Sequence, residues 1–162
     1  MVSPVDAPCD ETRVREILGT VADPEIPALS VVELGLVRAV RWTGEFFEID
    51  ITPTYSGCPA VAMIEEEIAA AMSAAGVPAV VRRVLAPAWT TDWLSAEARR
   101  KLTGAGIAPP GRVIPGWERD PVACPHCGSS ETELVSAFGS TACKALHRCR
   151  GCGSPFDHFK PL

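Results

Sequence analysis

The chain has 162 residues, of which 47% are hydrophobic, and a formal net charge of −5. This length predicts one domain with a core of its own, alone or with a small second module. No apolar run reaches the length of a membrane span, and the first residues lack the basic and apolar regions of a secretory signal. We therefore expect a cytoplasmic protein, in which seven cysteines indicate metal binding or reactive thiols rather than disulfides.

The charge is distributed unevenly along the chain. Residues 1–121 are acidic, whereas residues 122–162 carry four basic and three acidic side chains, a net charge of +1. Neither part has the basic patch that neutralises phosphates, so the sequence predicts no nucleic-acid partner.

The first half of the chain predicts alternating helices and strands. After a loosely held start at residues 1–9, Asp10 can cap a helix over residues 11–22. Apolar alternation predicts strands at 36–42 and 46–52, which form a hairpin across the turn at 43–44. A helix over 59–75, a strand over 79–85 and a helix over 96–102 follow, which gives the order α-β-β-α-β-α.

Two carboxylates stand in a rigid stretch between the first helix and the hairpin. Residues 23–27 read DPEIP, with Asp23 directly before the first proline and Glu25 between the two. The simpler interpretation is turn chemistry, in which Asp23 accepts hydrogen bonds from backbone N–H groups. The alternative is an acidic loop that faces a cysteine or a metal, and spacing alone favours the turn.

Cys58 is the first functional candidate. It lies where the second strand ends and the following helix begins, with Gly57 before it and Pro59 at the predicted first helical position. A thiol at or next to the N-cap lies near the positive end of the helix dipole, which predicts a lowered pKa and raised reactivity. The alternative is that Cys58 is a small buried apolar side chain, and position alone weighs the two equally.

The C-terminal part predicts a metal-binding module. Residues 103–121 are rich in proline and glycine and predict a linker between a domain over 1–102, with its core at 11–102, and a module over 122–162. Two C-x2-C pairs, Cys124 with Cys127 and Cys149 with Cys152, have the spacing of a four-thiolate site.

This layout is typical of a zinc ribbon. We expect a hairpin of residues 132–138 and 142–148, a last strand in 155–162, and a structural zinc that holds the module together. An iron–sulfur cluster is the alternative occupant. We interpret Cys143 as a buried packing residue rather than an exposed thiol. His126 and His147 could substitute as metal ligands, but four cysteines already complete the coordination shell. Phe156 and Phe159 are candidates for core packing or for a docking surface.

Several stretches together resemble a known family. DPEIP at 23–27, VELGLV at 32–37 and TPTYSGCP at 52–59 resemble the metal–sulfur cluster assembly family, the SufT/PaaD-like domain, over roughly residues 11–102. PAWTTDW at 87–93, TACKAL at 141–146 and PFDHFK at 155–160 resemble its PaaD-like members, which carry a zinc ribbon. The fold that this implies is α+β: a small mixed-sheet domain followed by a small all-β zinc ribbon.

The resemblance also implies a role and a set of residues. The family's reactive cysteine corresponds to Cys58, and its other functional positions correspond to Asp23, Glu25 and either Thr52 or Thr54. PaaD-like proteins accompany the di-iron oxygenase and the reductase of the phenylacetyl-CoA epoxidase system in aerobic phenylacetate catabolism. The resemblance therefore implies that this chain is an accessory factor that matures iron–sulfur or di-iron centres. Cys58 would then hold iron or an iron–sulfur cluster transiently.

Three functions stay open at this point. An assembly factor would bind its cargo at Cys58 and share it with a client or with a second copy in a homodimer, because residues 1–121 contain no cysteine besides Cys9 and Cys58. A Cys58-nucleophile enzyme would need His126, His147 or His158 from the ribbon as its base. A structural component of the oxygenase complex would not need the Cys58 thiol. The sequence favours an accessory protein without catalytic turnover of its own.

Overall fold

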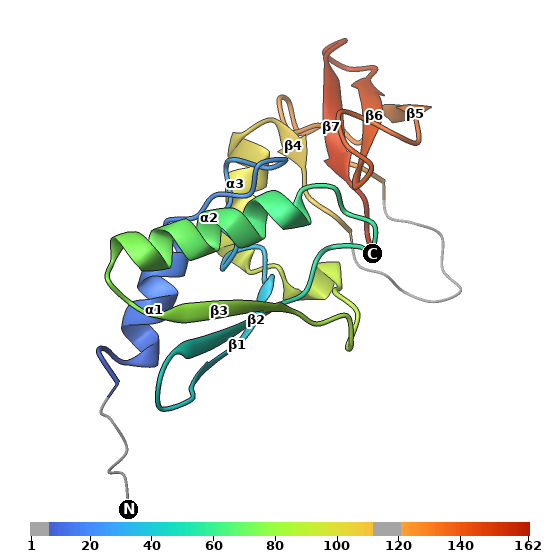
Figure 1. Cartoon of the computed structure of the whole chain (residues 1–162). Coiled ribbons are helices and arrows are strands. Elements are labelled where there is room, and N and C mark those ends of the chain that lie inside the picture. The colour runs from blue at the N-terminus through green and yellow to red at the C-terminus, as the bar shows by residue number, and fades with distance from the viewer. Residues whose placement is uncertain (1–6, 112–120) are drawn as a thin grey trace, which may run out of the picture. The chain divides into compact units, whose positions relative to one another are not determined.

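The structure is a computed structural model that describes residues 7–111 and 121–162. The chain forms two compact units, Met1–Trp89 and Thr90–Leu162, and Figure 1 shows their helices and strands. Our expectations for residues 1–6 as part of a loosely held start, and for residues 112–120 as part of a linker, lie outside the described residues.

The first unit is a three-stranded mixed sheet with two helices. Its elements are α1 (Glu11–Leu18), β1 (Val37–Trp42), β2 (Phe47–Ile51), α2 (Val61–Ala74) and β3 (Ala79–Arg83). β1 pairs with β2 in antiparallel fashion, and β2 pairs with β3 in parallel. The parallel pair requires a crossover, which α2 supplies. This confirms the predicted hairpin and the mixed sheet.

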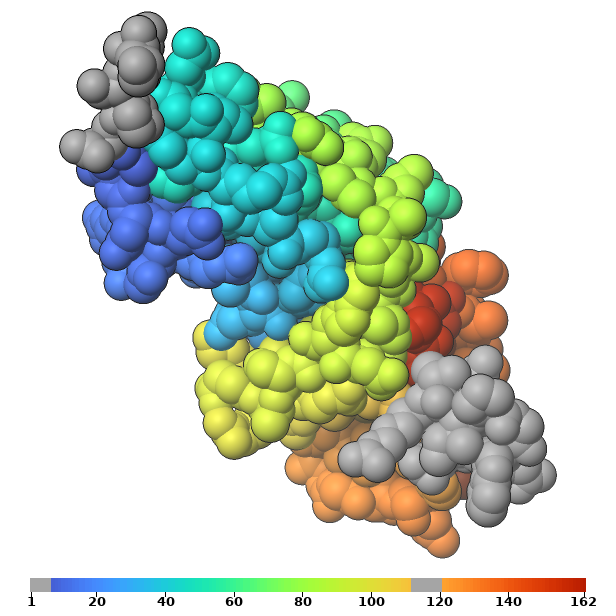
Figure 2. Space-filling view, turned by 90° about the horizontal axis from the view of Figure 1, so that it is seen from below, coloured from blue at the N-terminus to red at the C-terminus, as the bar shows by residue number. Residues whose placement is uncertain are grey.

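One face of this sheet builds the core. Phe47, Ile49 and Ile51 of β2 are at most 1% exposed, and α1 contacts β1 while α2 contacts β3. Figure 1 shows α2 running across the sheet, and Figure 2 shows α1, in blue, beside the cyan hairpin on one face of the unit. Burial of these apolar side chains is the main favourable term for this unit.

The other face of the sheet is charged. Glu48 and Asp50 of β2 form ion pairs with Arg41 of β1 and Arg82 of β3, at distances from 2.5 to 3.5 Å. The alternation that the sequence predicts for 46–52 therefore separates an apolar face from an ion-pair network.

Both helices of the first unit are shorter than predicted. α1 ends at Leu18 rather than at residue 22, because the chain turns at Gly19 and Ala22 forms a bridge to Ser30. α2 begins at Val61 rather than at residue 59, with Ala60 as its N-cap. Val21 is still 6% exposed, so it contributes to the core without being helical.

The second unit contains the ribbon. Its elements are a short 3-10 helix (Thr91–Trp93), α3 (Ala96–Gly104), β4 (Ile107–Ala108), β5 (Thr132–Ser136), β6 (Lys144–Cys149) and β7 (Pro155–Phe159). The strands form one sheet in the order β4-β7-β6-β5. The antiparallel pairs β5–β6 and β6–β7 confirm the predicted ribbon hairpin and last strand.

The boundary between the two compact units lies after Trp89, earlier in the chain than the boundary that we predicted. We placed residues 96–102 in the first domain and residues 103–121 in a linker. Instead α3 lies in the second unit, where it contacts β4, and β4 pairs with β7 in parallel.

Within the described residues, no helix has the length and apolar character needed to cross a membrane.

Candidate functional site

Cys58 lies in the loop that joins β2 to α2. Its N–H donates to the carbonyl of Tyr55 at 3.1 Å, and its own carbonyl accepts from Val61 N–H at 3.4 Å. The side chain is half-buried. Cys58 therefore precedes α2 by three residues, so our placement of the thiol at or next to the N-cap and of Pro59 as the first helical residue is wrong.

The DPEIP loop is organised by Asp23. Its Oδ1 accepts hydrogen bonds from Glu25 N–H and Ile26 N–H, each at 2.8 Å, and the residue is 6% exposed. This confirms the turn chemistry expected of Asp23. The same two hydrogen bonds fix the path of the chain through Glu25.

The structure brings this loop to the Cys58 thiol. Burial raises the pKa of Cys58 above its ordinary value, and the negative charges of Glu25 and Asp23 raise it further. Hydrogen bonds from Ala60 N–H and from the Thr54 hydroxyl act in the opposite direction. The lowered pKa that we expected is therefore wrong, and Cys58 is a thiol at neutral pH.

The two threonine candidates differ in their position. Thr54 hydrogen-bonds the Cys58 sulfur. Thr52 is 2% exposed, and its N–H donates to Leu36 carbonyl at 2.8 Å, which continues the strand pairing past Ile51. Its hydroxyl has no hydrogen-bond partner among the described residues. Thr54 is thus the threonine that acts on the thiol.

Sequence reasoning missed Arg83, which ends β3. Its Nε and Nη2 donate to the two carboxylate oxygens of Glu65 at 3.0 and 2.9 Å. Glu65 raises the pKa of Arg83, and the Cys58 thiolate, when it forms, raises it further, so the guanidinium lies within electrostatic reach of the ionised sulfur. The available signal was a basic pair, Arg82 and Arg83, in an otherwise apolar strand.

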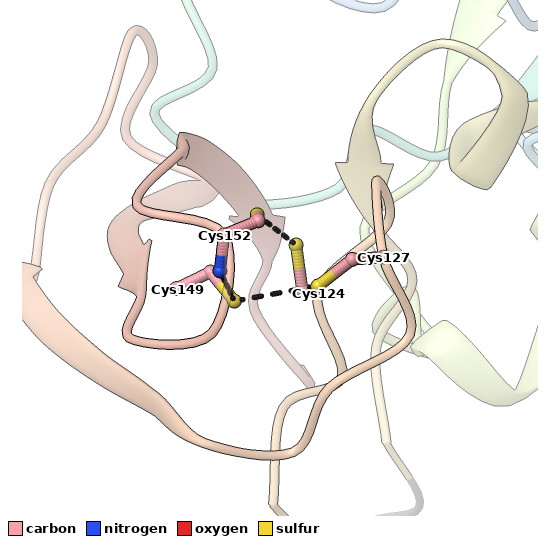
Figure 3. A group of neighbouring side chains, drawn as sticks. All are labelled: Cys124, Cys127, Cys149 and Cys152. Carbon is pink, nitrogen blue, oxygen red and sulfur yellow. Dashed lines mark hydrogen bonds between the residues drawn. The ribbon is translucent and has the colours of Figure 1, made fainter.

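The four cysteines of the second unit form a compact sulfur cluster. Figure 3 shows Cys124, Cys127, Cys149 and Cys152 converging from two loops, and their sulfur atoms lie within 4.8 Å of one another. The Cys124–Cys152 and Cys127–Cys149 sulfur pairs are 3.8 and 3.6 Å apart. A tetrahedral ion with metal–sulfur bonds of about 2.3 Å needs sulfurs about 3.8 Å apart, so the cluster fits a four-coordinate metal.

Both loops of the cluster use the same backbone geometry. In each, the first cysteine accepts a hydrogen bond at its carbonyl from a glycine four residues later, and donates its N–H to a serine carbonyl five residues later. The four bonds are Gly128 N–H to Cys124, Cys124 N–H to Ser129, Gly153 N–H to Cys149, and Cys149 N–H to Ser154, all at 2.9 Å. Gly128 and Gly153 have φ of 77° and 78°, which glycine adopts readily.

The remaining candidates of the ribbon lie outside this cluster. Cys143 is 3% exposed, with its sulfur 3.1 Å from the Thr141 hydroxyl, as expected of a buried filler. His147 is buried and stacks on Phe156. Phe156 and Phe159 are 4% and 0% exposed, so both pack in the core rather than form a docking surface.

Two families match separate parts of the chain. Residues 11–85 match the family described as iron–sulfur cluster assembly protein. Residues 109–160 match the family described as PaaD zinc beta ribbon domain. The two matches cover the Cys58 site and the four-cysteine cluster respectively.

Three known proteins are similar to the chain. A putative component of the 1,2-phenylacetyl-CoA epoxidase of Escherichia coli K12 is 47% identical over 95% of this chain and 94% of its own length. An Fe-S protein maturation auxiliary factor of Porphyromonas gingivalis W83 is 35% identical over 57% of this chain and 90% of its own. The crystal structure of a domain of unknown function, DUF59, from Bacillus anthracis has a TM-score of 0.53 and 28% identity, over 57% of this chain and 90% of that one.

Proposed function

The chain belongs to the PaaD family, and from this premise we propose that it is a maturation factor for a metal centre of the phenylacetyl-CoA epoxidase system. Its cargo would be iron or an iron–sulfur cluster, delivered to an iron–sulfur or di-iron client. The names of two relatives support the two halves of this proposal, since one is a putative epoxidase component and the other a maturation factor.

The observation that carries the proposal is the grouping of Asp23, Glu25 and Thr54 around Cys58. The two carboxylates oppose ionisation of the thiol, but they attract a cation and offer oxygen ligands to iron. A cation that binds the sulfur must displace its proton, so uptake of cargo is coupled to proton release. Because that proton opposes binding, the site suits cargo that is held and then passed on.

The site is incomplete as a cluster ligand set. Cys58 supplies one sulfur, and Cys9 is the only other cysteine in residues 1–121. An iron–sulfur cluster is held by four thiolates. We therefore propose that a bound cluster is shared with the client or with a second copy of the chain.

The ribbon has a different task in this proposal. Its four sulfurs form a closed shell for zinc, with Cys124 and Cys149 buried and Cys127 and Cys152 exposed. A closed shell leaves no position for a substrate, so bound zinc would supply a structural cross-link between the two loops. An iron–sulfur cluster at this position stays the alternative.

The partners and the compartment are also proposals. We propose the oxygenase and reductase components of the epoxidase as clients. Four of the seven cysteines converge in the metal-binding cluster, a use of cysteine that is typical of a reducing compartment and supports work in the cytoplasm.

The experiment compares Cys58→Ala with wild type in cells that depend on the epoxidase. The readouts are epoxidase activity and the iron content of the purified oxygenase and reductase. Cys9→Ala is the matched control, because it removes the other half-buried thiol of the first unit and leaves the Cys58 loop intact. Both variants are first shown to be folded and to retain the ribbon metal.

For a maturation factor we expect Cys58→Ala to lower both activity and client iron at least severalfold, with Cys9→Ala unchanged. Fully loaded and active clients in Cys58→Ala would overturn the proposal in favour of a structural component of the oxygenase complex. Steady turnover of an acyl thioester by the purified chain would instead support a Cys58 nucleophile. A thiol with a raised pKa is poorly suited to that role.

A further inference from the structure

The second unit contains a cavity that the four-cysteine cluster does not use. Its volume is about 620 Å³, within the range of pockets that hold small organic ligands. Its wall is largely apolar and includes Ala108 of β4, Ala145 of β6, Leu134 of β5 and Val122. Gly111 and Pro121, which flank the undescribed residues 112–120, also line it.

Three polar side chains reach this apolar wall. Lys160, just after β7, donates from Nζ to the carbonyl of Ala137 at 3.1 Å and lies 4.5 Å from the centre of the Phe138 ring. His147 and His158 line the cavity and are 9% and 7% exposed. The Nδ1 atom of His147 is buried without a hydrogen-bond partner among the described residues.

The described part of the lining carries charge of one sign. Among the described lining residues there is one lysine and no aspartate or glutamate. The Ala137 carbonyl takes one of the three N–H donors of the ammonium, so the group keeps donors for an anion.

We propose that this cavity binds a small organic carboxylate with an apolar body, whose carboxylate pairs with Lys160 and whose body contacts Ala108, Leu134 and Ala145. The inference does not depend on the proposed maturation role, since it uses only side chains of the second unit.

The test is a titration of the metal-loaded full chain with 4-phenylbutyrate, followed by ¹H–¹⁵N NMR. We expect binding in the high micromolar to low millimolar range, as for a ligand of few atoms. The shifted amides should lie in β6 and in residues 158–161. The neutral amide 4-phenylbutyramide and the ring-free butyrate should each bind at least about tenfold more weakly, because each lacks one half of the recognition.

Substitutions of Lys160 test whether its positive charge binds the carboxylate. Lys160→Met should weaken 4-phenylbutyrate binding about tenfold, the loss expected for a charge-assisted hydrogen bond. Lys160→Arg should retain binding. Lys101→Met is the matched control, since it removes one exposed lysine of α3 that does not line the cavity. Absence of binding, equal binding of acid and amide, or equal weakening by Lys160→Met and Lys101→Met would each overturn the proposal.

Discussion

At the scale of single residues, Cys58 shows how a loop distant in sequence changes the chemistry of a thiol. Residues 23 and 25 precede it by more than thirty positions, yet their carboxylates and the burial of the sulfur together keep it protonated. The hydrogen bonds from Ala60 N–H and the Thr54 hydroxyl stabilise the thiolate, but their effect on the pKa is smaller than that of burial and the two carboxylates. The balance between these influences can be tested one side chain at a time.

Removing the charge of Glu25 should make Cys58 more reactive. In Glu25→Gln one of the two negative charges that raise the pKa of Cys58 is gone, so the thiolate fraction rises at any pH below that pKa. We expect severalfold faster alkylation by iodoacetamide at pH 8, and a pH–rate profile displaced to lower pH. Peptide mass spectrometry measures the Cys58 rate separately from those of the other cysteines.

Thr54→Val is the control, because it should change the alkylation rate of Cys58 in the opposite direction. It removes a hydrogen bond that lowers the pKa of Cys58, so alkylation should become slower at the same pH. If both variants change the rate in the same direction, the substitutions act through the loop conformation rather than through charge. Glu25 is preferable to Asp23 for this test, because Asp23 Oδ1 also holds two backbone N–H groups.

The sequence identified the residues of this site but not their ionisation. The resemblance at 23–27 and 52–59 indicated Asp23, Glu25, Cys58 and either Thr52 or Thr54, and the structure brings Asp23, Glu25 and Thr54 to Cys58. The direction of the pKa shift depended on where α2 begins and on how deeply the sulfur is buried. Neither follows from the spacing of residues in the chain.

At the scale of elements, the two metal-binding loops depend on a glycine that closes each of them. Gly128 has φ of 77°, and a Cβ there would meet nothing within 4 Å. Gly128→Ala should therefore cost about 1 kcal/mol through backbone conformation alone. We expect weaker metal retention in competition with a chelator and an equal loss of stability in the metal-loaded ribbon.

Gly104→Ala is the matched control for this prediction. Gly104 is the last residue of α3, it has no positive φ, and a Cβ there also meets nothing within 4 Å. The substitution should leave metal retention unchanged and stabilise the unit by up to about 1 kcal/mol. Equal weakening of metal binding by both substitutions would contradict the assignment of the effect to the left-handed conformation.

Elements with a strong local pattern were predictable, and those defined by distant partners were not. The alternation of 46–52 and that of 132–138 act within a few residues, and the hairpins that they predict are confirmed. β4 has two residues and exists because it pairs with Asp157 and His158 of β7. The early end of α1 likewise follows from the bridge between Ala22 and Ser30.

At the scale of the whole molecule, the two units are stabilised in different ways. The first has a sheet with one largely apolar face, which packs against α1 and α2. In the second, Cys124 and Cys149 lie in one small core with Ala108 and Phe156, so the proposed metal site is part of that core. Composition indicated the small module, but the position of the boundary at Trp89 depends on the contact of α3 with β4.

Removal of the metal should therefore unfold the second unit and spare the first. Apparent binding free energies of structural zinc are on the order of 10 kcal/mol, more than a unit of this size retains without its metal. Addition of a strong chelator should collapse the ¹H–¹⁵N resonances of β5, β6 and β7, while those of β1, β2 and β3 persist. Cys149→Ser should reproduce this pattern, whereas Cys143→Ser, at a buried cysteine outside the cluster, should keep the metal and the ribbon resonances. Loss of both sets of resonances would mean that the metal holds the whole chain together, and retention of both would show that it has no structural role.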